Sequence, residues 1–128
     1  MTGKEDNIME DNRKEQLEAL EVLGEFNERL VKNMKIIAKE LSGSRLDDTD
    51  KFLKSIIDAI NWEIQVVNGT LDVLNEEKER LNKEDFNVAV ISLSNAINDN
   101  NDTEMAEEFR KITPVFEQLG VSIKEVIA

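Results

Sequence analysis

Residues 50–81 read DKFLKSIIDAINWEIQVVNGTLDVLNEEKERL, and this stretch decides the fold. Its apolar residues follow one another at alternating spacings of four and three, which is typical of a helix that packs lengthwise against other helices. Lys78 interrupts this series, whose members are Leu53, Ile57, Ile60, Ile64, Val67, Leu71, Leu74 and Leu81. The pattern predicts one helix of about 48 Å at 1.5 Å per residue.

A break inside this helix is the alternative, because Asn68-Gly69-Thr70 has the composition of a turn with a new helix start. A turn would reset the phase of the apolar series. The series keeps its phase from Val67 to Leu71, so an unbroken helix is the favoured prediction.

A first helix is predicted from Asp11 to the Ser42-Gly43-Ser44 segment, where Gly43 can adopt the left-handed conformation that ends helices. Gly24 interrupts it at a cost of about 1 kcal/mol relative to alanine. Asn27 occupies an inward position, where a polar residue often fixes helix register. The predicted inward residues are Leu20, Leu23, Leu30, Met34, Ile37 and Leu41, with Leu17, Phe26 and Ile36 at the edges.

Two more helices follow the long one. The third is predicted from Asn82, a good N-cap residue, to about Ile97. The last begins at Asp102 or Thr103, and its apolar phase crosses Pro114, which predicts a kinked helix rather than two helices. The inward residues are Phe86, Val90, Leu93 and Ile97 in the third, and Met105, Phe109, Ile112, Phe116, Leu119, Ile123 and Val126 in the last.

Four apolar stripes joined by short polar links predict an all-α protein. The expected architecture is an antiparallel up-down-up-down four-helix bundle with a long central second helix and a Pro-kinked last helix. Residues 1–10 are expected to be a disordered or frayed tail, and residues 11–128 a single bundle domain.

Composition excludes several classes of function. The 128-residue chain has a formal net charge of −12, which argues against binding to nucleic acid or to an anionic membrane surface. It has no cysteine and no histidine, which removes disulfides, thiolate and histidine catalysis, and most zinc and di-iron sites. No signal peptide and no run of about 20 apolar residues is present, so a cytoplasmic protein without membrane insertion is expected.

Candidate chemical groups are few. No acidic residue lies clearly on an apolar stripe, so paired catalytic carboxylates are not expected in the interior. Lys78 does lie on the second stripe, and it is interpreted as a lysine that reaches solvent at a bundle end. No catalytic, cofactor-binding or metal-binding residue is therefore predicted, and no cofactor.

The candidate functional surface is the side of the second helix opposite its predicted stripe. It carries the only tryptophan, and its members are Trp62, Val66, Gly69, Val73 and Ala59. Either this face is covered inside the fold, or it binds a protein partner or a second copy of the chain, with the tryptophan as anchor.

The runs Ile60-Asn61-Trp62-Glu63 and Ile97-Asn98-Asp99, with Met105-Ala106-Glu107 and Thr113-Pro114, resemble small uncharacterised all-helical bundle proteins of low-GC Gram-positive bacteria. The resemblance covers the chain from about residue 15. It implies a helical bundle and supplies no catalytic residue.

The function expected from these observations is that of a non-enzymatic cytoplasmic module for protein–protein interaction, acting by self-association or by holding an amphipathic segment of a partner. Size, charge and fold are also similar to those of export chaperones for flagellar or type III secretion substrates. The alternative from another class is a small-ligand carrier or enzyme with a pocket between helices, lined by Met34, Met105 and phenylalanines.

Overall fold

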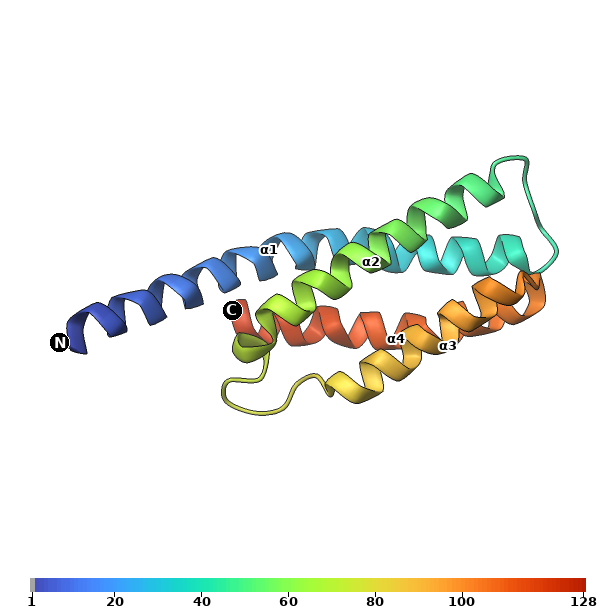
Figure 1. The fold of residues 1–128 in the computed structure, drawn as a ribbon. Helices are drawn as coiled ribbons and strands as arrows, with labels where there is room; N and C mark the ends of the chain where they lie inside the picture. The colour runs from blue at the N-terminus through green and yellow to red at the C-terminus, as the bar shows by residue number, and fades with distance from the viewer. Residues whose placement is uncertain (1) are drawn as a thin grey trace.

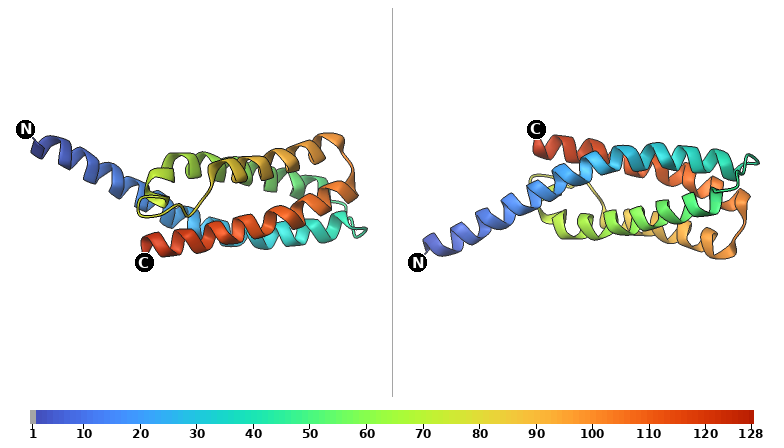
Figure 2. Two further views of the ribbon diagram at one scale, coloured as in Figure 1. Left: turned by 90° about the horizontal axis from the view of Figure 1, so that it is seen from below. Right: turned by 90° about the horizontal axis from the view of Figure 1, so that it is seen from above.

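The protein is an all-α four-helix bundle (Figure 1). The structure is a computed structural model that describes the backbone of residues 2–128 and the side chains of residues 12–128. Its helices are α1 (Thr2–Leu41), α2 (Thr49–Leu74), α3 (Lys83–Asp99) and α4 (Asp102–Ile127). Successive helices run in opposite directions, which confirms the predicted fold class (Figures 1 and 2).

The bundle is organised around its first and last helices. α1 makes its most extensive packing with α4 and its next most extensive with α2, and α3 packs on α4. In contrast, no Cα atom of α2 lies within 8 Å of a Cα atom of α3, and both helices are fully described. The side of the bundle between α2 and α3 therefore lacks the close backbone packing of the other three sides.

α1 and α4 bury the residues that the sequence predicts. All six inward residues of α1 are buried, and so are six of the seven of α4, while Val126 is half-buried. Ile36 is the exception in α1, because 48% of its surface is exposed. α3 buries Phe86 and Leu93, with Val90 and Ile97 half-buried.

α2 is rotated relative to the prediction. Its buried positions are Thr49, Leu53, Ile56, Ile60, Glu63, Val67, Thr70, Val73 and Leu74. Ile57, Ile64 and Leu71, which were expected to face the core, are half-buried at its edge. The rotation follows from the contact with α1, which covers the side of α2 that carries Trp62. The prediction that no acidic residue faces the interior is therefore wrong, because Glu63 does.

α2 is unbroken at residues 68–70, as predicted, but it ends at Leu74 rather than Leu81. Asn75 is the reason, because its side chain organises the following loop. Its Oδ1 accepts from the backbone N–H groups of Arg80 (2.9 Å) and Leu81 (3.0 Å), and its Nδ2 donates to the Leu81 carbonyl (3.0 Å). The Arg80 guanidinium also donates to the Leu74 carbonyl (2.9 Å), which satisfies one of the free acceptors at the helix end. The long second helix is thus shorter than predicted, and α1 is the longest.

The other helix ends follow local capping rules. Gly43 has a positive φ of 108° after the end of α1. Asn82 and Asn101 each accept a hydrogen bond from the backbone N–H three residues later, at 3.0 and 3.1 Å, and so start α3 and α4. α4 continues through Pro114, which confirms one last helix rather than two.

The start of α1 differs from the prediction. The helix begins at Thr2, whereas the apolar pattern placed its start at Asp11. Its first turns extend past the end of the other helices (Figure 2). The side chains of residues 1–11 lie outside the described residues, and the division into a tail of residues 1–10 and a domain of residues 11–128 stays a prediction.

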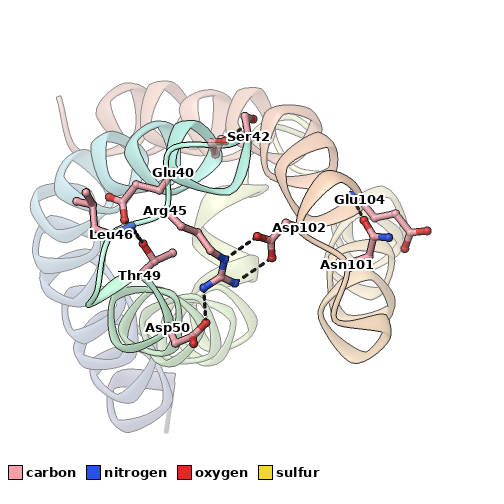
Figure 3. A network of polar contacts seen from close by, with 10 residues as sticks. Glu40, Ser42, Arg45, Leu46, Thr49, Asp50, Asn101, Asp102 and Glu104 are labelled. Atoms are coloured by element: carbon pink, nitrogen blue, oxygen red, sulfur yellow. Dashed lines mark hydrogen bonds and ion pairs between the residues drawn. The ribbon is translucent and has the colours of Figure 1, made fainter.

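A polar network ties the α1–α2 loop to the start of α4 (Figure 3). The Arg45 guanidinium donates to both carboxylate oxygens of Asp102, at 2.6 and 2.9 Å, and to Asp50 at 2.8 Å. Hydrogen bonds from this guanidinium lower the pKa of Asp102. Beside it, Thr49 Oγ1 donates to Glu40 (2.7 Å) and accepts from the Leu46 N–H (2.8 Å). One arginine therefore joins three segments at this end of the bundle.

Candidate functional site

The residues of the predicted Trp62 face are placed along the contact between α2 and α1. Val73 is buried, Ala59 and Val66 are half-buried against the core, and Gly69 is exposed. Trp62 retains 38% of its surface, and its ring packs on Phe26 of α1 with centroids 4.8 Å apart. The structure thus divides this face into a covered part and an accessible part, and its role in partner binding stays a prediction.

The accessible part continues onto α1. Val22 lies one helical turn before Phe26 and is 57% exposed. Beyond Val22 in the same direction, Val66 and Gly69 line a hollow of about 400 Å³ between α1 and α2. The α1 side of this hollow consists of Asn12, Glu15, Gln16 and Ala19. We call this surface the Trp62 crease and define it by Val22, Phe26, Trp62, Val66 and Gly69.

Small side chains make the hollow possible. A Cβ atom built on Gly69 would meet no atom within 4 Å, so open space lies above this glycine. Gln16 Oε1 is a buried acceptor without a hydrogen-bond partner among the described residues, and Gln16 lines the hollow. A bound segment could therefore place apolar atoms in the open space at Gly69.

A second unusual feature lies on the inner side of the same helix. Glu63, the residue after Trp62, is fully buried, and neither of its carboxylate oxygens has a hydrogen-bond partner among the side chains that the structure describes. Asn27, the residue after Phe26, is only 2% exposed, and its Oδ1 has no partner among them either. Because the rings of Phe26 and Trp62 pack on each other at an angle of 59°, these two buried polar residues, each next in sequence to one of the rings, lie at a similar level of the bundle.

Burial alone raises the pKa of Glu63 from its ordinary value of 4.5 to about 8. At neutral pH the group is therefore mostly protonated, and a neutral carboxylic acid is far less costly to bury than a carboxylate. It also gains an O–H donor that the ionised form lacks. No charged group among the described residues contributes to this rise in pKa, and burial is its cause.

Asn27 also marks the close contact between α1 and α4. Its Nδ2 donates to the Phe116 carbonyl at 2.9 Å, and whether Asn27 fixes the register of the helices stays a prediction. Gly120 makes room for it, since a Cβ atom there would lie 3.1 Å from Asn27 Nδ2. Gly24 has the same role one turn away, where a Cβ atom would lie 3.2 Å from Ile123. These glycines allow the two helices to approach.

A groove of about 660 Å³ runs along this α1–α4 contact. Val31, Val121 and Ile127 supply apolar walls, and Gly24 and Gly120 form part of the lining. Two ion pairs join the helices along it, Lys35 with Glu117 and Lys124 with Glu28, both at 3.6 Å. The groove is therefore apolar at the base and charged at the rim.

The inter-helix pocket that the sequence analysis considered, lined by Met34, Met105 and phenylalanines, is filled by those side chains. Met34, Met105, Phe109 and Phe116 are fully buried in the core, and Phe86 packs on Phe116 with centroids 5.4 Å apart. Lys78 lies in the loop after α2, where it is exposed and 3.8 Å from Glu125. It therefore occupies no helical stripe.

Two kinds of feature are absent from the described residues. No group of three or more acidic side chains is arranged so that it could hold a metal ion. None of the helices combines the length and the apolarity that crossing a membrane requires.

Sequence reasoning missed Glu63, Phe26 and Val22 as members of the site. A signal for Glu63 was present, because Leu53, Ile56, Ile60, Glu63, Val67, Thr70 and Leu74 also form a stripe with spacings of three and four. The stripe that contains Ile57, Ile64 and Leu71 is more apolar and was preferred. The partnership of Phe26 with Trp62 had no local signal.

Comparisons with known proteins give a family but no activity. Neither the curated proteins nor the solved structures contain a match to this chain. One family model matches residues 18–121, which is most of the chain and includes parts of all four helices. The chain therefore belongs to the family described as Domain of unknown function (DUF8042).

Proposed function

We propose that the protein is a non-enzymatic cytoplasmic interaction module that binds an apolar or amphipathic segment of a protein partner, or of a second copy of itself, at the Trp62 crease. The observation that carries the proposal is the partly exposed Phe26–Trp62 pair, which continues through the exposed Val22 to the hollow at Gly69. Aromatic side chains are the most frequent energetic anchors of protein interfaces. A pair that is already packed loses little conformational freedom on binding.

The export-chaperone hypothesis is a specific form of this proposal. In that form the bound segment belongs to a secreted or flagellar protein, and the crease holds it before export. Support for this form comes from the size, acidity and helical fold of the chain, which are similar to those of export chaperones. Similarity of this kind is an analogy between folds.

A small-ligand carrier is the second candidate, and the α1–α4 groove favours it. Its volume of about 660 Å³ lies within the range of small-molecule sites, about 300 to 1,000 Å³. Its apolar walls and charged rim would suit an amphiphilic molecule. A rise in melting temperature with a small molecule, abolished by Gly120→Leu and unaffected by Trp62→Ala, would support this candidate.

The test of the main proposal uses a natural probe. The chain has one tryptophan and no tyrosine, so its intrinsic fluorescence reports on the crease alone. Affinity purification from the native host, with mass spectrometry, would compare the wild type with Trp62→Ala and with Ile91→Ala. Ile91 is the matched control because it is a large apolar residue of α3 with 57% of its surface exposed.

A partner retained by the wild type and by Ile91→Ala, but lost with Trp62→Ala, would support the proposal. The fluorescence of Trp62 should shift when that purified partner is added. Light scattering of the three proteins tests self-association in the same way. A strictly monomeric protein whose partners all survive Trp62→Ala would contradict the proposal.

A further inference from the structure

The charge distribution around the Trp62 crease narrows the class of partner. Four carboxylates lie beside it on two helices: Glu15 and Glu18 on α1, and Asp58 and Asp72 on α2. All four are exposed, and none takes part in an ion pair with another described residue.

Helical spacing and direct contact place these carboxylates at the rim. Glu15 lines the hollow, and Glu18 lies one turn before Val22. Asp58 lies one turn before Trp62, and Asp72 lies three residues after Gly69. Residues three or four apart on a helix are neighbours on its surface. The apolar crease is therefore flanked by negative charge along its length.

The positive side chains at the crease are fewer. Arg29 lies over the Phe26 ring, 5.8 Å from its centroid, and Arg13 forms an ion pair with Glu76 at 2.7 Å. Arg13 is therefore already paired with a carboxylate of the loop after α2. An aromatic surface with a mostly acidic rim complements a ligand that is apolar on one side and basic on its edges.

We propose that the Trp62 crease accepts a basic amphipathic helix, whose apolar face covers Trp62 and Val66 while its lysines and arginines pair with Glu15, Glu18, Asp58 and Asp72. This inference rests on the proposed function and adds the chemistry of the partner to it. A helix is the bound form because two antiparallel helices offer a long straight crease, on which side chains at i, i+3 and i+4 can dock.

The experiment titrates the full-length protein with synthetic peptides and follows the Trp62 fluorescence. The probes are an 18-residue leucine/lysine amphipathic helix and a leucine/glutamate helix with the same apolar face. The leucine/lysine peptide should bind and shift the tryptophan emission, and its affinity should fall steeply as salt is raised, because the ion pairs are exposed. The leucine/glutamate peptide should bind at least about tenfold more weakly.

Two double charge-reversal variants distinguish the effect of the charges at the rim from the effect of the net charge of the protein. Asp58→Lys with Asp72→Lys changes the rim, and Asp99→Lys with Glu107→Lys makes the same change in net charge at the α3–α4 hollow. The rim variant should bind the leucine/lysine peptide about tenfold more weakly, while the control should stay within about twofold of the wild type. Circular dichroism checks that both variants remain helical, and Asp58→Asn with Asp72→Asn replaces the rim variant if it unfolds.

The proposal fails if the leucine/lysine peptide causes no change in Trp62 emission, if both peptides bind equally, or if the two reversals weaken binding equally. The more general proposal, that the protein is an interaction module, can hold even if the basic-helix inference fails. It survives if Trp62→Ala removes a natural partner that the rim reversal leaves bound, and the basic-helix inference alone is then overturned.

Discussion

Trp62 and Glu63 are adjacent in sequence, but each side chain lies in the environment that would be expected of the other. The large aromatic side chain is 38% exposed, whereas the ionisable carboxyl group beside it is completely buried. Buried glutamate without a partner is rare, because removing a charge from water costs several kcal/mol or forces protonation. One turn of α2 thus carries both the accessible aromatic surface and the least favourable buried group.

Glu63→Gln should make the protein less sensitive to pH. The folded-state pKa of about 8 lies above the ordinary 4.5, so the native state holds a proton that the unfolded state releases between these values. The stability associated with this proton is complete below pH 4.5 and is lost as pH rises through 8, with a slope of up to about 1.4 kcal/mol per pH unit. The glutamine variant lacks this slope and should exceed the wild type in stability above pH 8.

Urea denaturation at several pH values between 4 and 9 measures this difference. Glu25→Gln, at an exposed position of α1, is the control and should follow the wild-type profile. Parallel profiles for Glu63→Gln and the wild type would show that the carboxyl group is ionised in the folded protein.

Trp62→Ala should cost less stability than a core substitution. Ile60 is 3% exposed, and its replacement by alanine should lower the free energy of unfolding by about 2–5 kcal/mol. The partly exposed Trp62 should cost about 2 kcal/mol or less, because less of its surface is removed from water on folding. An equal or larger loss for Trp62→Ala in chemical denaturation would mean that the residue is a structural anchor of the α1–α2 contact rather than an interface residue.

The glycines offer a matched comparison. Gly69→Ala should raise the free energy of unfolding by about 0.5–1 kcal/mol, because alanine favours helix and the new methyl group meets only open space. Gly120→Ala should gain less or lose stability, since its methyl group would press on Asn27, which is held by the Phe116 carbonyl. The melting temperatures of the two variants show which substitution stabilises the protein more. A gain at Gly120 equal to that at Gly69 would show that the α1–α4 contact is looser than described.

Asn75→Ala should destabilise the loop between α2 and α3. It removes an acceptor for two backbone N–H groups and a donor to the Leu81 carbonyl, which predicts a loss of about 1–3 kcal/mol. Hydrogen exchange at residues 76–82 should become faster than in the wild type. Asn68→Ala, at an exposed position of α2, is the control, and similar exchange in both variants would contradict this role for Asn75.

The sequence predicted the helices better than it predicted their faces. The stripes of α1 and α4 are single and strongly apolar, so their buried residues could be named. α2 carries two overlapping stripes, and its own periodicity cannot show which one a neighbour covers. The choice depends on α1, whose Phe26 packs on Trp62, and a contact between distant segments leaves no mark in either segment alone. For the same reason, the sequence alone did not predict that Glu63 is buried.

The end of α2 was missed for a different reason. Apolar periodicity continued to Leu81, and Leu81 is indeed buried, but it reaches the core from a loop. The side chain of Asn75 decides this by replacing helical hydrogen bonds with its own. Asparagine is common enough inside helices that its presence alone did not predict the stop.

The extensive packing of α1 against α4 also determines when the protein can fold during its synthesis. A nascent chain that has been completed through α3 possesses α1 and α2 but lacks α4, the helix with which α1 packs most extensively. The part of the apolar surface of α1 that α4 covers therefore stays uncovered until residues 102–127 have emerged from the ribosome. The core of the bundle is complete only when α4 is present.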